Sequence, residues 1–285
     1  MTGPTPLDPV LYEPIARRAI EEDLGRAGDL TTNLVVPASA RVRASLVARA
    51  AGRIAGLPIA ASVFRILDAA TDIELSAKDG HDAAGGEVLS VIEGPARPIL
   101  TAERTALNFL GHLSGIATAT RDFVEAVADH PAKIVCTRKT TPGLRTLEKY
   151  AVRAGGGSNH RFGLDDAVLI KDNHLAIAGG VATAVERARK GIGHLVKIEV
   201  EVASLGELDE ALGAGVDAVL LDNMTIAEMA EGVAIASGRA VVEASGSITL
   251  ANAAEVAATG VDLISVGWVT HSAPALDVAL DFQPT

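Results

Sequence analysis

The sequence predicts an α/β protein, in which a (β/α) barrel follows a smaller α+β domain. The first observation is a series of short β-rich apolar runs in the second half of the chain, each followed at once by polar residues or glycine. The second is that Ala-, Glu- and Leu-rich segments with helical apolar spacing separate the last four runs. Strand, helix and strand at intervals of about 20 to 30 residues indicate βαβ units and therefore parallel strands.

Six apolar runs are the expected strands of the barrel. They cover residues 134–136, 167–170, 196–202, 218–221, 241–244 and 263–266. The expected helices between the later runs are 205–212, 226–236 and 250–258. Six or seven such units in about 150 residues fit a barrel better than an open doubly wound sheet. The sequence has no G-x-G-x-x-G motif between a first strand and helix, which weakens the open-sheet alternative further.

The first hundred residues have a different pattern. Residues 41–50 and 73–77 are expected strands, residues 60–70 form an expected helix, and glycines between them mark turns. This arrangement predicts a separate α+β domain. A long helical pattern then runs from Thr101 to about Ala128, with Thr101 as the expected N-cap.

Composition narrows the class of protein. The 285 residues are 48% hydrophobic with a mean hydropathy of +0.29, enough apolar side chain for a full core. The longest uncharged stretch, residues 105–120, is too short for a membrane-spanning helix and contains polar side chains. No secretory signal is visible, and the one cysteine, Cys136, cannot form an internal disulfide. These features predict a cytoplasmic protein without a membrane partner.

The net charge of −11 argues against binding nucleic acid over the whole surface, so an anionic substrate requires a local cluster of cations. Cationic side chains do gather at the expected strand ends and in loops. They are Arg104, Arg138, Lys139, His160, Arg161 and Lys171. Five fixed cations and a histidine in so acidic a chain predict a ligand with several negative charges.

Other strand-end residues point to a metal and a phosphate. Glu201 and Asp222 lie at the ends of two successive expected strands. They predict a Mg²⁺ site, because Mg²⁺ is typically held by one or two carboxylates plus substrate phosphates. Small residues at 245–247 and at Gly267 match the usual phosphate site of a barrel. In the run 196–202, Lys197, Glu199 and Glu201 alternate with aliphatic residues, so we expect the charged face to line the barrel interior.

Short motifs follow one another along nearly the whole chain. They include GDLTT at 28–32, LTAERTALN at 100–108, TRKTTPGLR at 137–145, NHR at 159–161, IKDNH at 170–174, EVE at 199–201, LLDN at 220–223 and EASG at 243–246. In this order they resemble the quinolinate phosphoribosyltransferase family. The resemblance implies an incomplete barrel of about seven parallel strands with an N-terminal α+β sandwich. The implied domains are 1–110, the catalytic barrel 111–272, and a C-terminal segment 273–285 that returns towards the N-terminal domain.

The resemblance also implies a reaction and its residues. The phosphoribosyl group of phosphoribosyl pyrophosphate would pass to quinolinate with decarboxylation, giving nicotinate mononucleotide, pyrophosphate and CO₂ in NAD biosynthesis. The implied catalytic residues are Lys139, Lys171, Glu201 and Asp222, of which Glu201 and Asp222 would face Mg²⁺, directly or through water or substrate. The implied substrate-binding residues are Arg104, Thr137, Arg138, Lys139, His160, Arg161, Lys171, Glu201, Asp222, Ser245, Gly246, Ser247, Val266, Gly267 and Trp268.

The implied assembly is a homodimer with shared active sites, in which Arg104 enters the partner's barrel; further assembly stays open. Two positions depart from the family's pattern: Ser247 stands where a glycine is usual, and Trp268 where a small residue is usual. If position 247 needs a positive φ, the serine is strained, although its hydroxyl could donate to the phosphate.

The sequence leaves three other functions open. One is a related phosphoribosyltransferase for a different acid, against which the complete cationic set argues. A second is a Schiff-base barrel aldolase that uses Lys171 or Lys197. A third is a non-enzymatic pyridine sensor, which would not need paired carboxylates beside a phosphate site.

Overall fold

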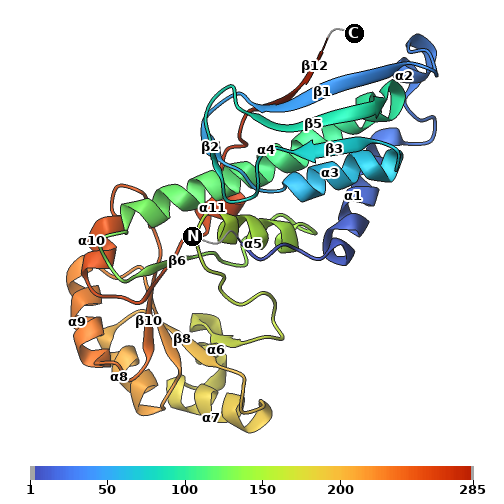
Figure 1. Cartoon of the computed structure of the whole chain (residues 1–285). Coiled ribbons are helices and arrows are strands. Elements are labelled where there is room, and N and C mark those ends of the chain that lie inside the picture. Colours follow the sequence, from blue (N-terminus) through green and yellow to red (C-terminus); the bar gives the residue numbers. More distant parts are fainter. Residues whose placement is uncertain (1–3, 284–285) are drawn as a thin grey trace. The chain divides into compact units, whose positions relative to one another are not determined.

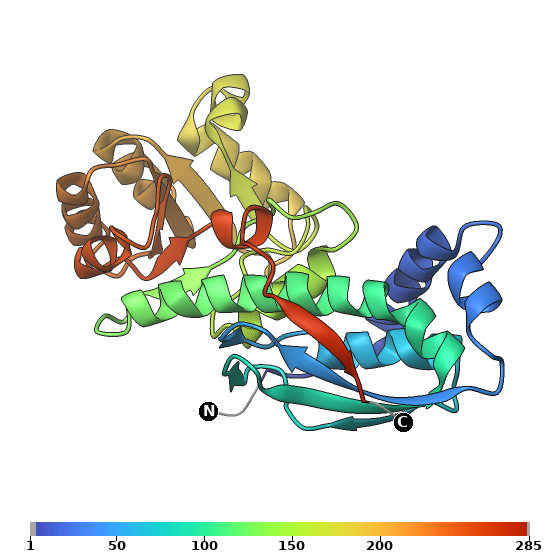
Figure 2. The same cartoon turned by 90° about the horizontal axis from the view of Figure 1, so that it is seen from above.

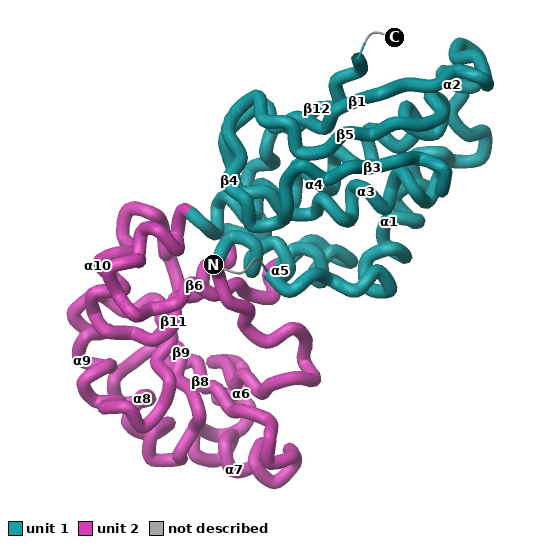
Figure 3. The backbone as a smooth tube through the Cα atoms, in the orientation of Figure 1, with its two compact units in different colours: residues 1–121, 140–156, 269–285 teal, residues 122–139, 157–268 magenta. Residues whose placement is uncertain are grey.

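The computed structural model describes residues 4–283, and the chain divides into two compact units (Figure 3). Unit 1 contains the residues up to 121, residues 140–156 and the residues from 269 onward. Unit 2 contains residues 122–139 and 157–268. The domain limits expected at residues 110 and 272 stay predictions.

Unit 1 is built on a four-stranded antiparallel sheet with the order β12-β1-β5-β3 (Figure 1). The strands are β1 (Arg41–Ala48), β3 (Asp72–Leu75), β5 (Val88–Pro95) and β12 (Val278–Phe282). The C-terminal strand β12 lies beside β1, from the pair Ala44 and Phe282 to the pair Ala48 and Val278 (Figure 2). The sheet of unit 1 therefore pairs a strand near the C-terminus with the first strand of the chain.

Helices and a small second sheet complete the described part of unit 1. The helices are α1 (Pro9–Leu24), α2 (Leu30–Val35), α3 (Leu57–Leu67), α4 (Ala96–Ala126, in unit 1 up to Arg121) and α5 (Arg145–Ala154), and the small sheet pairs β2 (Gly52–Arg53) with β4 (Asp82–Ala83). Aspartates begin two of these helices, since Asp8 accepts from the backbone N of Val10 at 3.0 Å and Asp29 from that of Thr32 at 2.8 Å. Fully buried side chains of the core include Phe64, Ile92, Ile99 and Leu110.

The long helix α4 begins earlier than the sequence predicts, at Ala96, directly after β5. Thr101 is therefore not its N-cap, and that prediction is wrong. Pro98 does not prevent the early start, because the first turn of a helix leaves its N–H groups without intrahelical partners. The Thr101 hydroxyl instead donates to Asp29 Oδ2 at 2.9 Å.

Unit 2 contains a six-stranded parallel sheet with the order β6-β11-β10-β9-β8-β7. The strands are β6 (Lys133–Val135), β7 (Val168–Ile170), β8 (Ile198–Val202), β9 (Ala218–Asp222), β10 (Val241–Ser245) and β11 (Leu263–Ser265). They confirm the mixed α/β class with a parallel barrel sheet and a separate N-terminal antiparallel sheet. Among the described residues β6 and β7 are the ends of the sheet, and Ser158 extends it by one parallel bridge to Val135. The barrel is thus incomplete, with six strands and a one-residue seventh position.

Helices separate the strands of unit 2, and α7 to α10 cover their outer side (Figure 1). The helices are α6 (Asp172–Ala178), α7 (Val181–Gly191), α8 (Leu205–Gly213), α9 (Ile226–Ala236) and α10 (Ala253–Ala258). The short helix α11 (Trp268–His271) follows the last strand and belongs to unit 1 from Val269 onward. Thr225 and Glu228 form a reciprocal capping box at the start of α9. Within residues 4–283, no helix combines the length and the apolar character that crossing a membrane requires.

Candidate active site

The strand register of unit 2 brings functional side chains to one edge of the parallel sheet. Ile170 pairs with Val200, so Lys171, the residue after β7, continues the register beside Glu201. Asp222 ends β9 and pairs with Ser245, which ends β10. Because register partners in a parallel sheet share a face, Lys171, Glu201, Asp222 and Ser245 lie on the same face at the carboxyl ends of the strands.

The Lys171 ammonium donates to Glu201 Oε2, in an ion pair whose lysine side chain is 45% exposed and whose glutamate is 14% exposed. Alternate residues of β8, Ile198, Val200 and Val202, are buried on the other face. The prediction that Glu199 and Glu201 share the charged face of this strand is therefore confirmed.

Lys197 does not belong to this site, and the expectation that it lines the barrel interior is wrong. Its side chain is 75% exposed and its Nζ donates to Asp217 Oδ1 at 2.6 Å. Lys197 precedes β8 and Asp217 precedes β9, so this ion pair lies at the amino ends of the strands. The alternation of side chains along a strand predicts a face, but it does not predict where the strand begins.

The turn after β10 requires a glycine. Gly246 has a φ of +96°, and a Cβ at this position would overlap Asn223 Oδ1 and lie 3.0 Å from the backbone N of Asn223. The Asn223 backbone N donates to the Ser245 carbonyl at 2.9 Å, and its side-chain amide donates to Asp222 Oδ2 at 2.9 Å. This turn therefore packs directly against the residue that follows the Asp222 carboxylate.

Ser247 adopts the left-handed conformation, with a φ of +53°. Its backbone is therefore in a region that an L-residue adopts only at a cost in conformational energy. This is the strain that the sequence predicts if position 247 needs a positive φ. The Ser247 side chain is exposed, and the Ser247 backbone carbonyl accepts a hydrogen bond from Asn252 Nδ2 at 3.1 Å.

The predicted residues after β11 differ in burial. Val266 is buried, and its backbone N donates to the Val135 carbonyl at 2.9 Å. Gly267 is half-buried, and Trp268 is 40% exposed at the start of α11. The Trp268 ring lies with its centroid 6.4 Å from that of Phe123, at an interplanar angle of 54°. An aromatic contact thus orients the bulky residue beside this turn.

Two arginines lie close enough to influence one another. Arg138 follows β6, and Arg161 follows the bridge at Ser158. Burial and the positive charge of Arg138 lower the pKa of Arg161, while Asp166 and Glu199 act in the opposite direction. Two guanidinium groups this close to one another favour the binding of an anion between them, because the negative charge reduces their mutual repulsion.

Thr137 and Lys139 flank Arg138 in the same segment. The backbone N of Lys139 donates to Thr137 Oγ1 at 3.0 Å, and the Lys139 side chain is exposed. Arg161 is held by a hydrogen bond from its Nη1 to the Ala167 carbonyl at 3.2 Å.

A cluster of His160, Glu199 and Glu243 lies among these residues, and the last two were not among the predicted site residues. His160 Nε2 lies 2.9 Å from Glu199 Oε2 and 3.7 Å from Glu243 Oε2. Burial and the neighbouring Glu199 carboxylate raise the pKa of Glu243 to about 7. Glu199 was expected only on the charged face of its strand, and the signal for Glu243 was a glutamate within the apolar run 241–244; nothing in the sequence indicated that the two meet.

Arg104 belongs to unit 1, whereas the other predicted site residues belong to unit 2. It is exposed on α4 and lines a cavity of about 240 Å³ together with Asp23, Asp29 and Thr101. An exposed arginine on a long helix is available to a ligand or to another protein chain.

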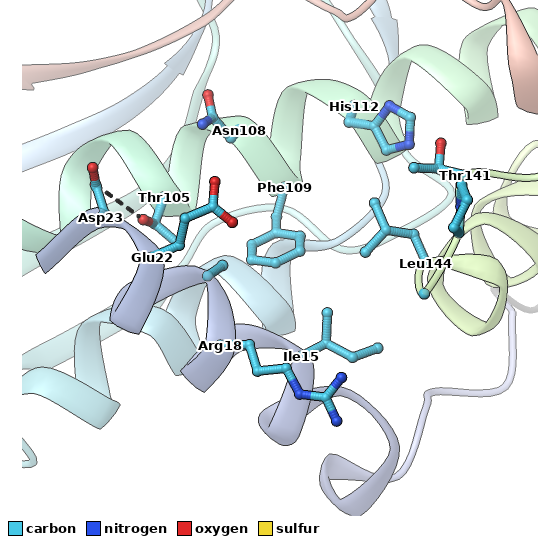
Figure 4. A pocket seen from close by; sticks show the side chains of 13 residues that line it. Ile15, Arg18, Glu22, Asp23, Thr105, Asn108, Phe109, His112, Thr141 and Leu144 are labelled. Carbon is cyan, nitrogen blue, oxygen red and sulfur yellow. Dashed lines mark hydrogen bonds between the residues drawn. The ribbon is translucent and has the colours of Figure 1, made fainter. Parts of the chain in front are cut away.

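A second cavity of unit 1, of about 650 Å³, lies between α1, α4 and residues 141–144 (Figure 4). None of the predicted site residues is among the described residues that line it. His112 faces it, and its Nε2 lies 2.9 Å from Oε1 of the fully buried Glu148, whose other oxygen accepts from the backbone N of Thr141 at 3.1 Å. The motifs around residues 100–115 and 137–145 therefore shape unit 1 as well as the strand ends.

Cations, paired carboxylates and a glycine turn at the carboxyl ends of a (β/α) barrel define an α/β-barrel enzyme for a polyanionic small molecule. Residues 29–114 match the quinolinate phosphoribosyl transferase N-terminal domain, and residues 116–281 match the C-terminal domain. The chain belongs to the quinolinate phosphoribosyltransferase family.

Its relatives cover nearly the whole chain. The nicotinate-nucleotide pyrophosphorylase [carboxylating] of Mycobacterium leprae is 45% identical, over 93% of this chain and 95% of the relative. Quinolinate phosphoribosyltransferase [decarboxylating] 1b of Nicotiana tabacum is 37% identical, over 93% of this chain and 81% of the relative. The crystal structure of NadC from Streptococcus pyogenes superimposes with a TM-score of 0.94 at 40% identity, covering 98% of this chain and 100% of NadC.

Proposed function

We infer that the protein transfers the phosphoribosyl group of phosphoribosyl pyrophosphate to quinolinate and releases pyrophosphate and CO₂, forming nicotinate mononucleotide. This is a pentosyltransferase reaction of NAD biosynthesis, and it is the activity that the names of its relatives describe. The observation that carries the assignment in this chain is the cationic group around Arg138 and Arg161 at the same strand ends as Glu201 and Asp222.

In the first step, the pyridine nitrogen of quinolinate forms a bond to ribose C1 while the bond from C1 to the pyrophosphate oxygen breaks. Positive charge develops on the sugar as the leaving group departs. Carboxylates placed beforehand stabilise this charge, since they need no reorganisation during the reaction. We assign this role to Glu201 and Asp222, and the Lys171 ion pair supports it by fixing the Glu201 carboxylate.

The two quinolinate carboxylates require cationic partners. We assign Arg138, Lys139 and Arg161 to them, with His160 beside these groups and Lys171 at the boundary between the quinolinate and the ribose. Once the ring nitrogen is quaternary, its positive charge stabilises the electron pair that stays on C2 when the bond to the departing CO₂ breaks, and this pair then takes up a proton. The cations bind the substrate, and the charged ring nitrogen itself provides this stabilisation.

The 5′-phosphate is assigned to the turns 245–247 and 266–268. The glycine at position 246 supports this assignment, because it places no side chain of its own in the way of a phosphate that approaches the backbone of the turn. The exposed Ser247 hydroxyl adds a donor that glycine lacks.

We propose Mg²⁺ as the metal, held by Glu201 and Asp222 together with substrate oxygens. Hard carboxylate oxygens on two adjacent strands are ligands that suit Mg²⁺, and the Asp222 carboxylate is only partly buried. When bound, Mg²⁺ neutralises charge on the pyrophosphate leaving group.

We further propose that the protein is a homodimer with shared active sites, to which each subunit contributes Arg104. The exposure of Arg104 on α4 supports this proposal. A cytoplasmic location stays a prediction from the sequence.

The alternative of a Schiff-base aldolase has less support. Lys197 lies at the amino end of its strand, away from the strand-end residues, and the Lys171 side chain is already engaged in an ion pair with Glu201. The direct test is an assay of the purified protein with quinolinate, phosphoribosyl pyrophosphate and Mg²⁺, in which nicotinate mononucleotide and CO₂ should form in equal amounts. Absence of turnover under these conditions would overturn the assignment.

A further inference from the structure

His160 lies between two carboxylates from different strands of unit 2. Glu199 comes from β8 and Glu243 from β10, and their nearest oxygens are 2.9 and 3.7 Å from His160 Nε2. The ligating atoms of the three residues lie within 4.8 Å of one another. Three groups that can each gain or lose a proton are therefore in contact.

Glu243 is the most deeply placed of the three, with its side chain 1% exposed. Neither of its carboxylate oxygens accepts a hydrogen bond of 3.5 Å or less from a described residue. Its register neighbours are the apolar Leu220 on β9 and Leu263 on β11. An ionised carboxylate in such surroundings is costly, and a carboxyl group there keeps its proton to a higher pH.

The hydrogen bonds of His160 favour a proton over a metal ion in this cluster. Its Nδ1 accepts from the backbone N of Arg161 at 2.7 Å, so in the neutral ring the hydrogen is on Nε2, which donates to Glu199. A metal on Nε2 would require the hydrogen on Nδ1, where it would face the N–H of Arg161. Metal-bound histidines instead direct the other ring N–H at an acceptor.

We propose that Glu243 is a positioning residue, which holds a proton beneath the His160–Glu199 pair and so keeps one negative charge there instead of two. The proposal rests on the proposed function for its effect on catalysis. A single charge on Glu199 keeps the His160 ring oriented through Nε2. The absence of a second charge limits repulsion of the dianionic quinolinate that the neighbouring arginines bind.

The charges around Glu243 agree with this role. Burial and the Glu199 carboxylate on β8 raise its pKa to about 7, whereas His160, the Ser265 hydroxyl on β11 and Lys171 after β7 oppose the shift. Its neighbour on β9, Leu220, carries no charge. Burial and Glu199 therefore favour the protonated form of Glu243 to a higher pH than in an exposed glutamate.

The first test concerns stability and does not depend on the reaction. Because the native state keeps a proton that the unfolded state releases, wild-type stability falls as the pH rises from the ordinary glutamate range through about pH 7. Glu243→Gln removes this dependence, so its melting temperature relative to wild type should increase between pH 5.5 and pH 8.5. An unchanged difference at the two pH values would overturn the proposal. Glu243→Met, which also removes the carboxyl group, provides the same comparison if the glutamine variant does not fold.

The second test measures kcat and KM for quinolinate from pH 6.5 to 8.5. The ratio of wild-type to Glu243→Gln kcat/KM should fall about tenfold across this range, the size expected for one unit charge at ~10 Å in an effective dielectric constant of ~20. Ionisation of the substrates cancels in this ratio. The change should appear in KM, because the added charge repels the bound dianion. A constant ratio would contradict the role in catalysis.

Glu199→Gln is the matched variant. It removes the negative charge of the group that accepts from His160 Nε2, so its kcat/KM should be reduced at every pH without the same pH-dependent ratio. If wild-type protein shows no turnover at all, the proposed function fails, and the melting temperatures still decide whether Glu243 holds a proton. If turnover occurs but the melting difference is independent of pH, the role of Glu243 fails alone.

Discussion

Lys171 and Glu201 continue the register of two neighbouring parallel strands, and the Lys171 ammonium donates a hydrogen bond to the Glu201 carboxylate. The lysine side chain is 45% exposed, so a large contribution of this pair to stability is not expected. Its importance lies in holding a carboxylate at the strand ends, two residues before the level of Asp222 on β9.

Substitution of Glu201 or Asp222 by alanine should reduce kcat/KM by about 30-fold or more, equivalent to roughly 2 kcal/mol of transition-state stabilisation. Each change removes a negative charge that faces the developing positive charge or its metal. Steady-state kinetics with both substrates measures the effect. Lys197→Met is the matched control, because Lys197 is a charged residue at the opposite end of β8, and its kcat/KM should stay within about twofold of wild type. Unimpaired turnover by both carboxylate variants would place the ribose site elsewhere.

Nicotinate should be a poor substrate, with kcat/KM at least about 100-fold below that for quinolinate. It lacks one carboxylate, so cationic groups around Arg138 and Arg161 would be left without their anion. The measurement is a direct comparison of the two acids under identical conditions. Equal values for the two acids would contradict the assignment of these arginines.

The shared site predicts complementation between two inactive variants. Arg104→Ala and Lys171→Ala should each be nearly inactive, but a mixed dimer contains one site with an intact barrel and a donated Arg104. Random reassociation gives about half mixed dimers with one good site of two, so about a quarter of wild-type activity should return. Mixtures that remain inactive despite demonstrated subunit exchange would show that Arg104 does not act across an interface.

Ser247→Gly should stabilise the protein slightly. Relief of the left-handed conformation gains ~1–2 kcal/mol, and the extra freedom of glycine in the unfolded chain offsets ~0.4–1 kcal/mol of it. The expected net gain is about 0.5 kcal/mol, or about 1–2 °C in the unfolding midpoint. If the hydroxyl donates to the 5′-phosphate, KM for phosphoribosyl pyrophosphate should rise at the same time.

Ser237→Gly is the control for this change. Ser237 also has a positive φ, of +46°, but it ends α9, at the other end of the βα unit from the strand-end site. This variant should gain similar stability and leave KM for phosphoribosyl pyrophosphate unchanged. If both variants change KM equally, Ser247 has no particular role with the phosphate.

Much of unit 2 was predictable because each of its strands is a short local pattern. All six apolar runs form strands, and their limits differ from the prediction by at most two residues at either end. The N-terminal region was less predictable. The strand β5 was not recognised, because antiparallel pairing with β1 and β3 depends on residues far away in the sequence.

The sequence by itself determined the period of strands and helices, the residue types at the strand ends, and the family that the motifs resemble. Only the tertiary structure decided that Lys197 lies at the amino end of its strand, away from the candidate site, and that Thr101 lies inside a helix. It also decided that Glu243 meets His160 and Glu199. Local patterns follow from the backbone period, whereas contacts between distant residues depend on strand order and register, which no single segment of the chain contains.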